Sequence, residues 1–455
     1  MRGWASPTLK RRPGFYPYSY CLKHNEYPYF INHLNEATTP KHPPPAAQKI
    51  IHPRPYLHPM LTNYPDALNK TLQQSFDWGE ETVPLAAAAG RILAEPLLAD
   101  RPLPPFDRVT MDGIAIDYTN YAAGQRTFPI TGIVAAGATT VSLTDPASCL
   151  EVMTGAVTPP GATTVIRYED LERVGESFVL PDGVQDGKNI HGEGSDAAAG
   201  ARLMSEGAKI GGAAINLLAS CGYAEVRVKR LPKVAVIATG DELVAVEAEP
   251  LPHQIRMSNL FHLQDQLATA GIAATTHHIV DDQVELGKRI AQLLADNDLL
   301  IFSGGVSKGK YDFLPEVLAE LGVERLFHRV AQRPGKPIWV GRTKDVMVFG
   351  LPGNPVSSLT GLLAYVGPFL RRNLGVAQWE DHRALAVDFT FAKDLTLFQV
   401  SQIAAATQRV APVTNGGSGD ASSMLRADGF LVLPQGRSTF TTGEYFPFLP
   451  FDRLL

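Results

Sequence analysis

The strongest constraint on the fold is a regular alternation of strand and helix patterns between residues 232 and 375. Leu260, Leu263 and Leu267 recur at helical spacing, and Gly271 ends that helix. Short apolar runs on either side predict buried strands: VAVIA (234–238), LLIF (299–302) and VMVF (346–349). Alternation at this spacing predicts an α/β domain with a doubly wound parallel sheet.

Each of these strands runs directly into a polar loop that contains glycine. Ligands of such sheets bind at the carboxyl ends of the strands, and glycine lets backbone N–H groups approach a phosphate or another oxyanion. One such loop is ordinarily only a sharp turn, but three on one sheet edge indicate a binding site. The loops are TGDE (239–242), SGGVSKGKYD (303–312) and GLPGNPVSS (350–358). None has the Walker or the dinucleotide-binding glycine pattern, so a Walker-type kinase and a dinucleotide dehydrogenase are poorly supported.

Carboxylates gather at the ends of the same strands: Asp241, Glu242, Asp281, Asp282 and Asp312. Together with phosphate oxygens, a pair of such groups can hold Mg²⁺, which prefers hard oxygen ligands. Asp282 begins the sequence DQVE, which fits a helix capping box, so we favour a capping role for it. Asp281 is freer for function.

Three cations lie in the segment RVAQRPGKP: Arg329, Arg333 and Lys336. A run of cations is usually a solvated face of a protein, and for Arg329 that interpretation stays open. A Pro-Gly turn separates Arg333 from Lys336 and restricts both, which favours a fixed anion site at lower entropic cost.

The remaining chain shows helical and strand patterns in separate segments. Residues 66–75 and 84–94 are helix-prone, and residues 210–220 predict a helix that Gly222 ends. Residues 102–190 predict a small β-domain, and the tail from about residue 385 predicts a small β-barrel.

Residues 1–59 are rich in proline, tyrosine and histidine without regular periodicity. For them we expect a disordered extension, or an upstream start added to a chain that begins at Met60.

Composition excludes several classes of function. The chain of 455 residues has 41 basic and 46 acidic side chains, a net charge of −5, which argues against bulk nucleic-acid binding. No apolar run approaches the ~18 residues of a membrane span. Three widely spaced cysteines give no disulfide framework and no metal knuckle. No zinc-protease motif or Ser-His-Asp order is present. We expect a cytoplasmic protein with neither a nucleic-acid nor a membrane partner.

Seven motifs, taken together, resemble those of the molybdopterin molybdenumtransferase family (bacterial MoeA and the E domain of gephyrin). They occur in the family's order and rough spacing, and the resemblance runs from Met60 to the C-terminus. The motifs are PPFDRVTMDG, MTGAVTPPGA, ATGDEL, SNLFHLQDQLATAG, SGGVSKGKYDF, RPGKP and GLPGNPVSS.

The resemblance implies a homodimer with four domains and an active site at the subunit interface. It also implies the reaction: molybdate is inserted into adenylylated molybdopterin, AMP is released, and a divalent ion, Mg²⁺, assists. The domains it implies are a helical domain in two segments (60–101 and 191–229), an inserted β-domain (102–190), a molybdopterin-binding α/β domain (230–378) and a C-terminal β-barrel (379–455).

Roles follow from the motifs that match. The resemblance implies that Asp112 and Thr154 are catalytic and come from the partner subunit's β-domain. It likewise implies that Glu242, Asp281 and Asp312 are catalytic and hold the metal, and that Lys336 is catalytic. The expected substrate-binding residues are Asp241, Ser303, Gly304, Gly305, Ser307, Arg329, Arg333, Pro352, Pro355 and Ser418.

The chain departs from the family pattern in four places. Arg329 and Arg333 stand where many members have lysine, and an arginine fork is not a lysine point charge. Lys310 occupies a place that is often acidic. The remaining departures are His191 where arginine is common, with Asp196 as the acidic match, and Gln399 and Val400 where an arginine is expected near Phe398.

Two other functions are weighed against the transferase. One is a binding or scaffold protein that keeps the pterin pocket without turnover, and the other is a different phosphate-handling enzyme on the same α/β scaffold. The complete acidic set and the RPGK cations favour turnover.

Overall fold

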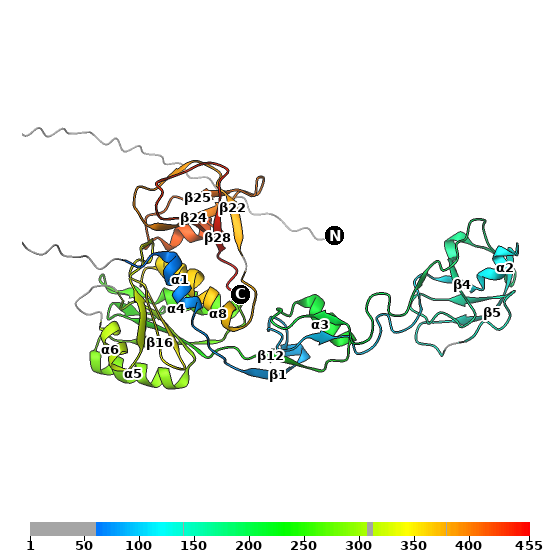
Figure 1. Cartoon of the computed structure of the whole chain (residues 1–455), viewed down its shortest axis with the longest axis horizontal. Coiled ribbons are helices and arrows are strands. Elements are labelled where there is room, and N and C mark those ends of the chain that lie inside the picture. Colours follow the sequence, from blue (N-terminus) through cyan, green and yellow to red (C-terminus); the bar gives the residue numbers. More distant parts are fainter. Residues whose placement is uncertain (1–60, 140, 307–312, 379) are drawn as a thin grey trace, which may run out of the picture. The chain divides into compact units, whose positions relative to one another are not determined.

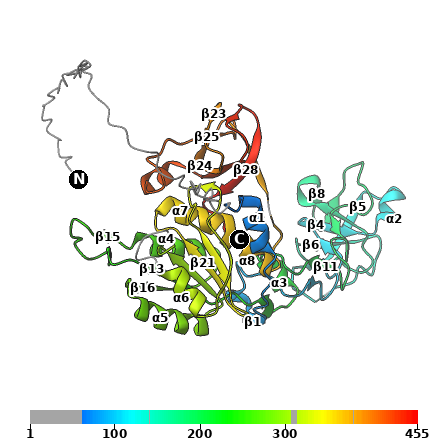
Figure 2. The ribbon, with the colours of Figure 1, turned by 60° about the vertical axis from the view of Figure 1, so that its left-hand side comes forward.

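The computed structural model of the chain describes residues 61–139, 141–306, 313–378 and 380–455 (Figure 1, Figure 2). The predicted extension 1–59 lies outside these residues. No helix in the described ranges is long and apolar enough to cross a membrane.

The α/β domain is built on a six-stranded sheet of order β16-β13-β17-β21-β20-β18. The four strands β13, β16, β17 and β21 run parallel, as the sequence predicts. The chain moves from β13 to β16 on one side and then to β17 on the other, so the strand order reverses at β13. Their bounds are Val234–Thr239 (β13), Ala274–Ile279 (β16), Leu299–Ser303 (β17) and Met347–Leu351 (β21).

The prediction of a wholly parallel sheet is wrong at one edge. Strand β20 (Trp339–Arg342) is antiparallel to β21, and β18 (Glu324–His328) is antiparallel to β20. The segment between β18 and β20 contains no helix, only β19 (Gln332–Arg333) and the RPGK turn. Without a crossover helix, consecutive strands pair antiparallel.

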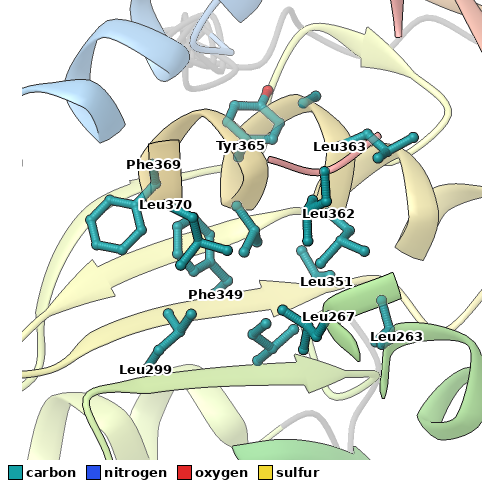
Figure 3. Close-up of a cluster of buried hydrophobic side chains, with 14 of the residues drawn as sticks. Leu263, Leu267, Leu299, Phe349, Leu351, Leu362, Leu363, Tyr365, Phe369 and Leu370 are labelled. Carbon is teal, nitrogen blue, oxygen red and sulfur yellow. The ribbon is translucent and has the colours of Figure 1, made fainter. Parts of the chain in front are cut away.

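Helices cover both faces of this sheet. Alternate residues of β13 point to opposite sides: Val234 and Val236 belong to one core, Ala235 and Ile237 to the other. The first core is packed by α4, α7, α8 and the π-helix η3 (Figure 3), and the second by α5 and α6. The bounds are Ser258–Thr269 (α4), Gln283–Asp296 (α5), Leu314–Glu320 (α6), Pro355–Gly361 (α7), Leu362–Val366 (η3) and Gly367–Asn373 (α8).

The two predicted segments of the helical domain do come together, but largely through strands. Strand β1 (Glu80–Pro84) pairs antiparallel with β12 (Glu225–Lys229), and β2 (Leu97–Leu98) with β11 (Arg202–Met204). Helix α3 (Gly212–Ser220) packs on these strands. Helix α1 (Tyr64–Leu72), which the prediction assigned to the same domain, packs instead against α8, η3 and β18 of the α/β domain.

The helix predicted over residues 84–94 does not form. Only a 3₁₀ turn, η1 (Leu85–Ala87), is present. Backbone N–H groups of this stretch donate to distant carbonyls instead: Leu85 to Ala224 and Leu93 to Ala208. These long-range bonds outweigh the helix propensity of the alanines, which is a weak preference.

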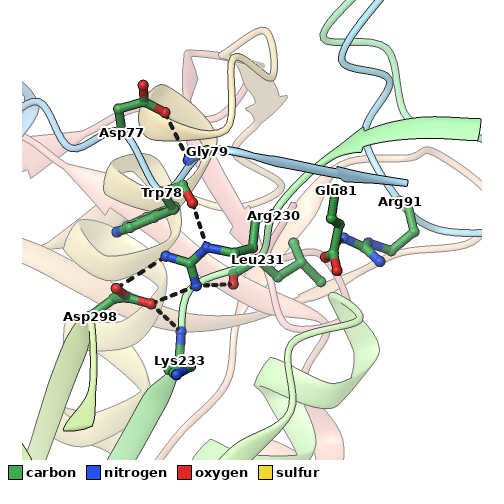
Figure 4. A network of polar contacts seen from close by, with 9 residues as sticks. All are labelled: Asp77, Trp78, Gly79, Glu81, Arg91, Arg230, Leu231, Lys233 and Asp298. Carbon is green, nitrogen blue, oxygen red and sulfur yellow. Dashed lines mark hydrogen bonds and ion pairs between the residues drawn. The ribbon is translucent and has the colours of Figure 1, made fainter. Parts of the chain in front are cut away.

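A polar cluster connects the domain that contains β1 and β12 to the first residues of the α/β domain (Figure 4). Both terminal nitrogens of Arg230 contact the Asp298 carboxylate, at 3.0 and 3.2 Å, and its Nε donates to the carbonyl of Trp78. The backbone N–H of Lys233 donates to the same carboxylate at 2.7 Å. The Asp298 carboxylate therefore holds Arg230 and Lys233, which lie between β12 and β13.

The inserted domain is a β-sheet of order β7-β4-β6-β5-β9-β8, with one short helix, α2 (Tyr118–Ala122), and one 3₁₀ turn, η2 (Tyr168–Asp170). Strands β3 (Arg108–Val109) and β10 (Ile190–His191) pair where the chain enters and leaves it. The sheet strands are Gly113–Ile116 (β4), Thr127–Val134 (β5), Cys149–Val152 (β6), Thr164–Arg167 (β7), Glu172–Val174 (β8) and Ser177–Val179 (β9).

The C-terminal strands form a sheet of order β19-β24-β26-β28-β22, with β25 paired to β24. A bridge from Leu385, directly after β22, to Val410 of β25 joins the two ends of this curled sheet, so the predicted barrel is present in part. Among the described residues, its end strands β19 and β22 do not pair with each other, and β19 comes from the α/β domain. The remaining bounds are Asp381–Ala384 (β22), Phe389–Thr390 (β23), Thr396–Ile403 (β24), Val410–Pro412 (β25), Ala421–Arg426 (η4), Gly429–Leu433 (β26), Thr439–Phe440 (β27) and Tyr445–Pro450 (β28).

Candidate active site

A cavity of about 990 Å³ opens at the carboxyl ends of the parallel strands. Residues that follow β13, β16, β17 and β21 all line it, which is where ligands bind when strand order reverses. A second parallel strand pair, β14 (Leu243–Val244) with β15 (Ile255–Arg256), forms one wall. The three glycine loops predicted from the sequence therefore meet at one site.

The loop after β17 lies against the loop after β13. Gly304 and Gly305 have φ of +109° and +69°, in the left-handed region. A Cβ on Gly304 would lie 2.8 Å from the carbonyl oxygen of Thr239, and one on Gly305 would lie 2.7 Å from the Thr239 hydroxyl. No other residue fits this approach, so glycine exposes the backbone here for a steric reason.

Asn259, which the sequence analysis did not single out, joins two of the loops. Its amide donates to the hydroxyl of buried Ser303 at 2.9 Å and to the carbonyl of Gly353 at 2.7 Å. Asn259 is the second residue of α4 and lines the cavity. The only sequence signal for it was its place at the head of the motif SNLFHLQDQLATAG.

Carboxylates also line this cavity. Glu242 and Asp281 both face it, whereas Asp241 does not line it. The Asp241 carboxylate instead accepts the backbone N–H of Asp281 at 3.1 Å and so supports that loop. Asp282 accepts the N–H groups of Val284 and Glu285 at 3.1 and 2.9 Å, which confirms its role as the cap of α5.

The donor set fits a magnesium ion in its chemistry. Glu242 and Asp281 supply hard carboxylate oxygens to one cavity, and Mg²⁺ is typically held by one or two carboxylates together with substrate phosphates. Within the described ranges, no cluster of three His, Cys, Asp or Glu side chains is present. Asp312, the third predicted ligand, lies outside the described residues, as does Ser307.

A second cavity of about 700 Å³ lies between the RPGK turn and the C-terminal sheet. Arg333 and Lys336 line it, both with exposed side chains. Pro352 and Asn354 line both cavities, so the acidic and the cationic sites adjoin.

Residues of the third loop connect these cavities to the C-terminal sheet. Asn354 donates its side-chain amide to the hydroxyl of Ser418 at 2.9 Å, and Ser418 lines the second cavity. Pro355, which lines the first cavity, begins α7. Gln399, at the position of the missing arginine, also lines the second cavity, and its amide donates to the carbonyls of Val400 and Val413.

Besides Asp241, three predicted residues within the described ranges line neither cavity. Arg329 lies at the end of β18 with φ of +68°, and its N–H donates to the carbonyl of Ile338. Asp112 and Thr154 lie together in the inserted domain, where the Asp112 carboxylate accepts the Thr154 N–H at 2.6 Å. Hydrogen bonds from the N–H and the hydroxyl of Thr154 hold the pKa of Asp112 below its usual value.

The substituted position His191 forms a small polar cluster of its own. Its Nε2 lies 2.8 Å from a carboxylate oxygen of Asp196, and its Nδ1 lies 3.2 Å from a guanidinium nitrogen of Arg108. The cluster joins β3 to β10, where the inserted domain begins and ends.

Three family models match successive parts of the chain. They are the MoeA N-terminal region, domains I and II (residues 62–222), the probable molybdopterin binding domain (235–372) and the MoeA C-terminal region, domain IV (383–451).

Relatives and solved structures match over most of the chain. A molybdopterin molybdenumtransferase of Synechocystis is 40% identical over 82% of this chain and 95% of its own length. One of Bacillus subtilis is 34% identical over 80% and 88%. The crystal structure of the molybdopterin biosynthesis MoeA protein of Pyrococcus horikoshii is similar with a TM-score of 0.73 and 30% identity, over 86% of this chain and 99% of that one.

Proposed function

Because the chain belongs to the molybdopterin molybdenumtransferase family, we propose that it inserts molybdate into adenylylated molybdopterin and releases AMP. The observation that supports this most is the adjacency of two unlike cavities. The first has glycine loops, two carboxylates and one cation, Arg256, whereas the second has cations and, among the described residues, no carboxylate, and Pro352 and Asn354 border both.

The proposed reaction gathers negative charge in one place, because an oxyanion approaches a dithiolate while a phosphoanhydride bond breaks. In our proposal Arg333 and Lys336 hold molybdate, since fixed cations stabilise such charge without reorganising during the reaction. The backbone of Gly304 and Gly305 holds the pterin and its phosphate. Pro352 separates the two binding regions.

Mg²⁺ fits the acidic part of the first cavity, where Glu242 and Asp281 would hold it together with Asp312. When bound, it would neutralise charge on the phosphate oxygens. Asp241 keeps the loop of Asp281 in place through the Asp281 N–H.

We also propose that the enzyme is a homodimer whose sites are completed across the subunit interface. Asp112 and Thr154 line neither cavity, so a site that uses them receives them from the partner subunit. In the chain itself the N–H and the hydroxyl of Thr154 bond the Asp112 carboxylate and lower its pKa. The cytoplasmic location stays a prediction.

The decisive experiment incubates purified protein with adenylylated molybdopterin, Mg²⁺ and molybdate, and follows AMP by chromatography. AMP release that requires molybdate supports the transferase. Tight substrate binding without AMP release would favour the scaffold hypothesis. AMP release that ignores molybdate would favour another phosphate-handling enzyme.

A further inference from the structure

A buried polar pair lies beneath the cationic turn. Gln332 and Tyr365 are 1% and 0% exposed. The Tyr365 hydroxyl donates to the side-chain carbonyl of Gln332, and the Gln332 amide donates to the backbone carbonyl of Pro334 at 3.0 Å. A chain of hydrogen bonds therefore runs from the α/β core into the turn.

The surroundings of this pair are apolar. Tyr365 belongs to the core cluster in Figure 3, where its hydroxyl is directed away from Phe349. Its ring packs edge-on against Tyr64 of α1 at 5.6 Å between centroids and also contacts Phe327. A phenol or amide in such a place destabilises the fold unless it is hydrogen-bonded, so each partner requires the other. Burial raises the pKa of Tyr365, so its hydroxyl stays a donor at neutral pH.

The turn is seated directly on the Gln332 amide. Gly335 has φ of +84°, and a Cβ there would lie 2.9 Å from the Gln332 nitrogen. The N–H of Val330 donates to the carbonyl of Lys336 at 2.9 Å and closes the loop from the other side. With its backbone held on both sides, the turn presents Arg333 and Lys336 to the second cavity.

The helix that carries Tyr365 is irregular at that point. Residues 362–366 form a π-helical turn between α7 and α8. Such π-helical turns are rare in proteins, but those that occur often lie at functional sites. Here the π-helical turn of residues 362–366 sets the direction in which the Tyr365 side chain points toward Gln332.

We propose that Gln332 and Tyr365 are positioning residues that hold the Arg333–Lys336 turn ready for an oxyanion. The proposal rests on the proposed function in taking that oxyanion as molybdate. Without the pair, the turn samples more conformations, and binding must restrict it again at a cost in affinity. Tyr365 lines neither cavity. Gln332 lines the second cavity, but its buried amide is bonded to Tyr365 and Pro334, so the pair acts through the two cations.

Three variants test the proposal: Tyr365→Phe, Gln332→Met and the double variant. Tyr365→Phe leaves the side-chain carbonyl of Gln332 without its donor, and Gln332→Met leaves both the Tyr365 hydroxyl and the Pro334 carbonyl without their partner. The double variant leaves only the Pro334 carbonyl so. Stability should therefore fall in the singles and recover in part in the double. The control is Tyr121→Phe in the inserted domain, which removes a hydroxyl that donates to the carbonyl of Pro181 and accepts the N–H of Val184, far in sequence from the cationic turn.

All three variants should raise the KM for molybdate about five- to tenfold, because the turn loses the stabilisation that about one hydrogen bond contributes. The kcat should change less than about twofold. Molybdate affinity measured by calorimetry should fall by the same factor. Amide hydrogen exchange at Gly335 and Lys336 should accelerate. Tyr121→Phe should change none of these.

A wild-type KM for molybdate in the double variant would overturn the proposal, because it would show that the pair stabilises the fold and does not position the turn. So would unchanged KM and unchanged exchange in all three variants, or a fall in kcat alone. If the wild-type enzyme releases no AMP, the proposed function fails, but exchange and molybdate calorimetry still decide the role of the pair.

Discussion

Asn259 shows how one side chain organises the site. It spans from the start of α4 to Ser303 in one loop and to Gly353 in another. Both bonds use its two N–H groups, so its donor capacity is fully occupied. The loops need this link because glycine leaves them free to adopt other conformations.

The variant Asn259→Asp keeps the size of the side chain but removes both donors and sets a carboxylate against the Gly353 carbonyl. We expect turnover to fall at least about tenfold, since charge repulsion and the loss of two hydrogen bonds separate the loops. Molybdate-dependent AMP release measures this. The control is Gln264→Leu on the same helix, whose amide bonds the carbonyl of Ala274. Equal losses in both variants would contradict a local role.

Lys336→Ala removes one of the two cations that the turn presents. We expect most turnover to be lost while thermal stability stays within about 0.5 kcal/mol of wild type, because exposed side chains contribute little to folding. The same loss is expected for Asp312→Ala. Lys344→Ala, at a position that lines neither cavity, serves as the control. Wild-type turnover in either variant would remove that residue from the site.

Among the elements, the strands β27 and β28 show how a local charge pair fixes a turn. The Arg437 guanidinium contacts the Glu444 carboxylate at 2.8 and 3.0 Å, and the Thr441 N–H donates to it at 2.8 Å. These bonds, that of Arg437 first, lower the pKa of Glu444 from 4.5 to about 2. The pair orders the end of the C-terminal sheet.

Since the folded state has the lower pKa, Glu444 stabilises the protein fully above pH 4.5, and the contribution disappears as pH falls through about 2. In Glu444→Gln the unfolding temperature should therefore vary less with pH over this window. Differential scanning calorimetry between pH 2 and 5 measures it. Arg437→Gln should act in the same direction, and an unchanged pH profile in both would refute the pairing in solution.

At the scale of the whole molecule, the described chain assembles only part of the predicted site. The α/β domain and the C-terminal sheet contribute residues to the two cavities, and the inserted domain contributes none. Asp112 and Thr154 nevertheless form an ordered pair there. Our proposal of a shared site accounts for both facts.

Mixing two inactive variants tests the shared site. After Asp112→Asn and Lys336→Ala proteins are dissociated together and reassociated, half of the dimers should be mixed, and each should carry one complete site. We expect about a quarter of wild-type AMP release. No recovery, with mixed dimers verified by mass spectrometry, would contradict a site built from two subunits.

The sequence by itself determined the parallel core of the sheet, its glycine loops, the cap Asp282 and the family. Each depends on neighbouring residues: hydrophobic period, turn chemistry and short motifs are local properties of the chain. The helix expected over 84–94 failed because bonds to residues more than a hundred positions away replaced it.

Tertiary structure alone decided which polar groups meet. Gln332 and Tyr365 stand 33 residues apart, and Asn259 and Gly353 stand 94 apart. It also decided that β18 and β20 run antiparallel and that Leu385 meets Val410 in the C-terminal sheet. Hydrogen bonds between distant groups require the intervening core to pack first, and no local pattern records the direction in which a buried side chain then points.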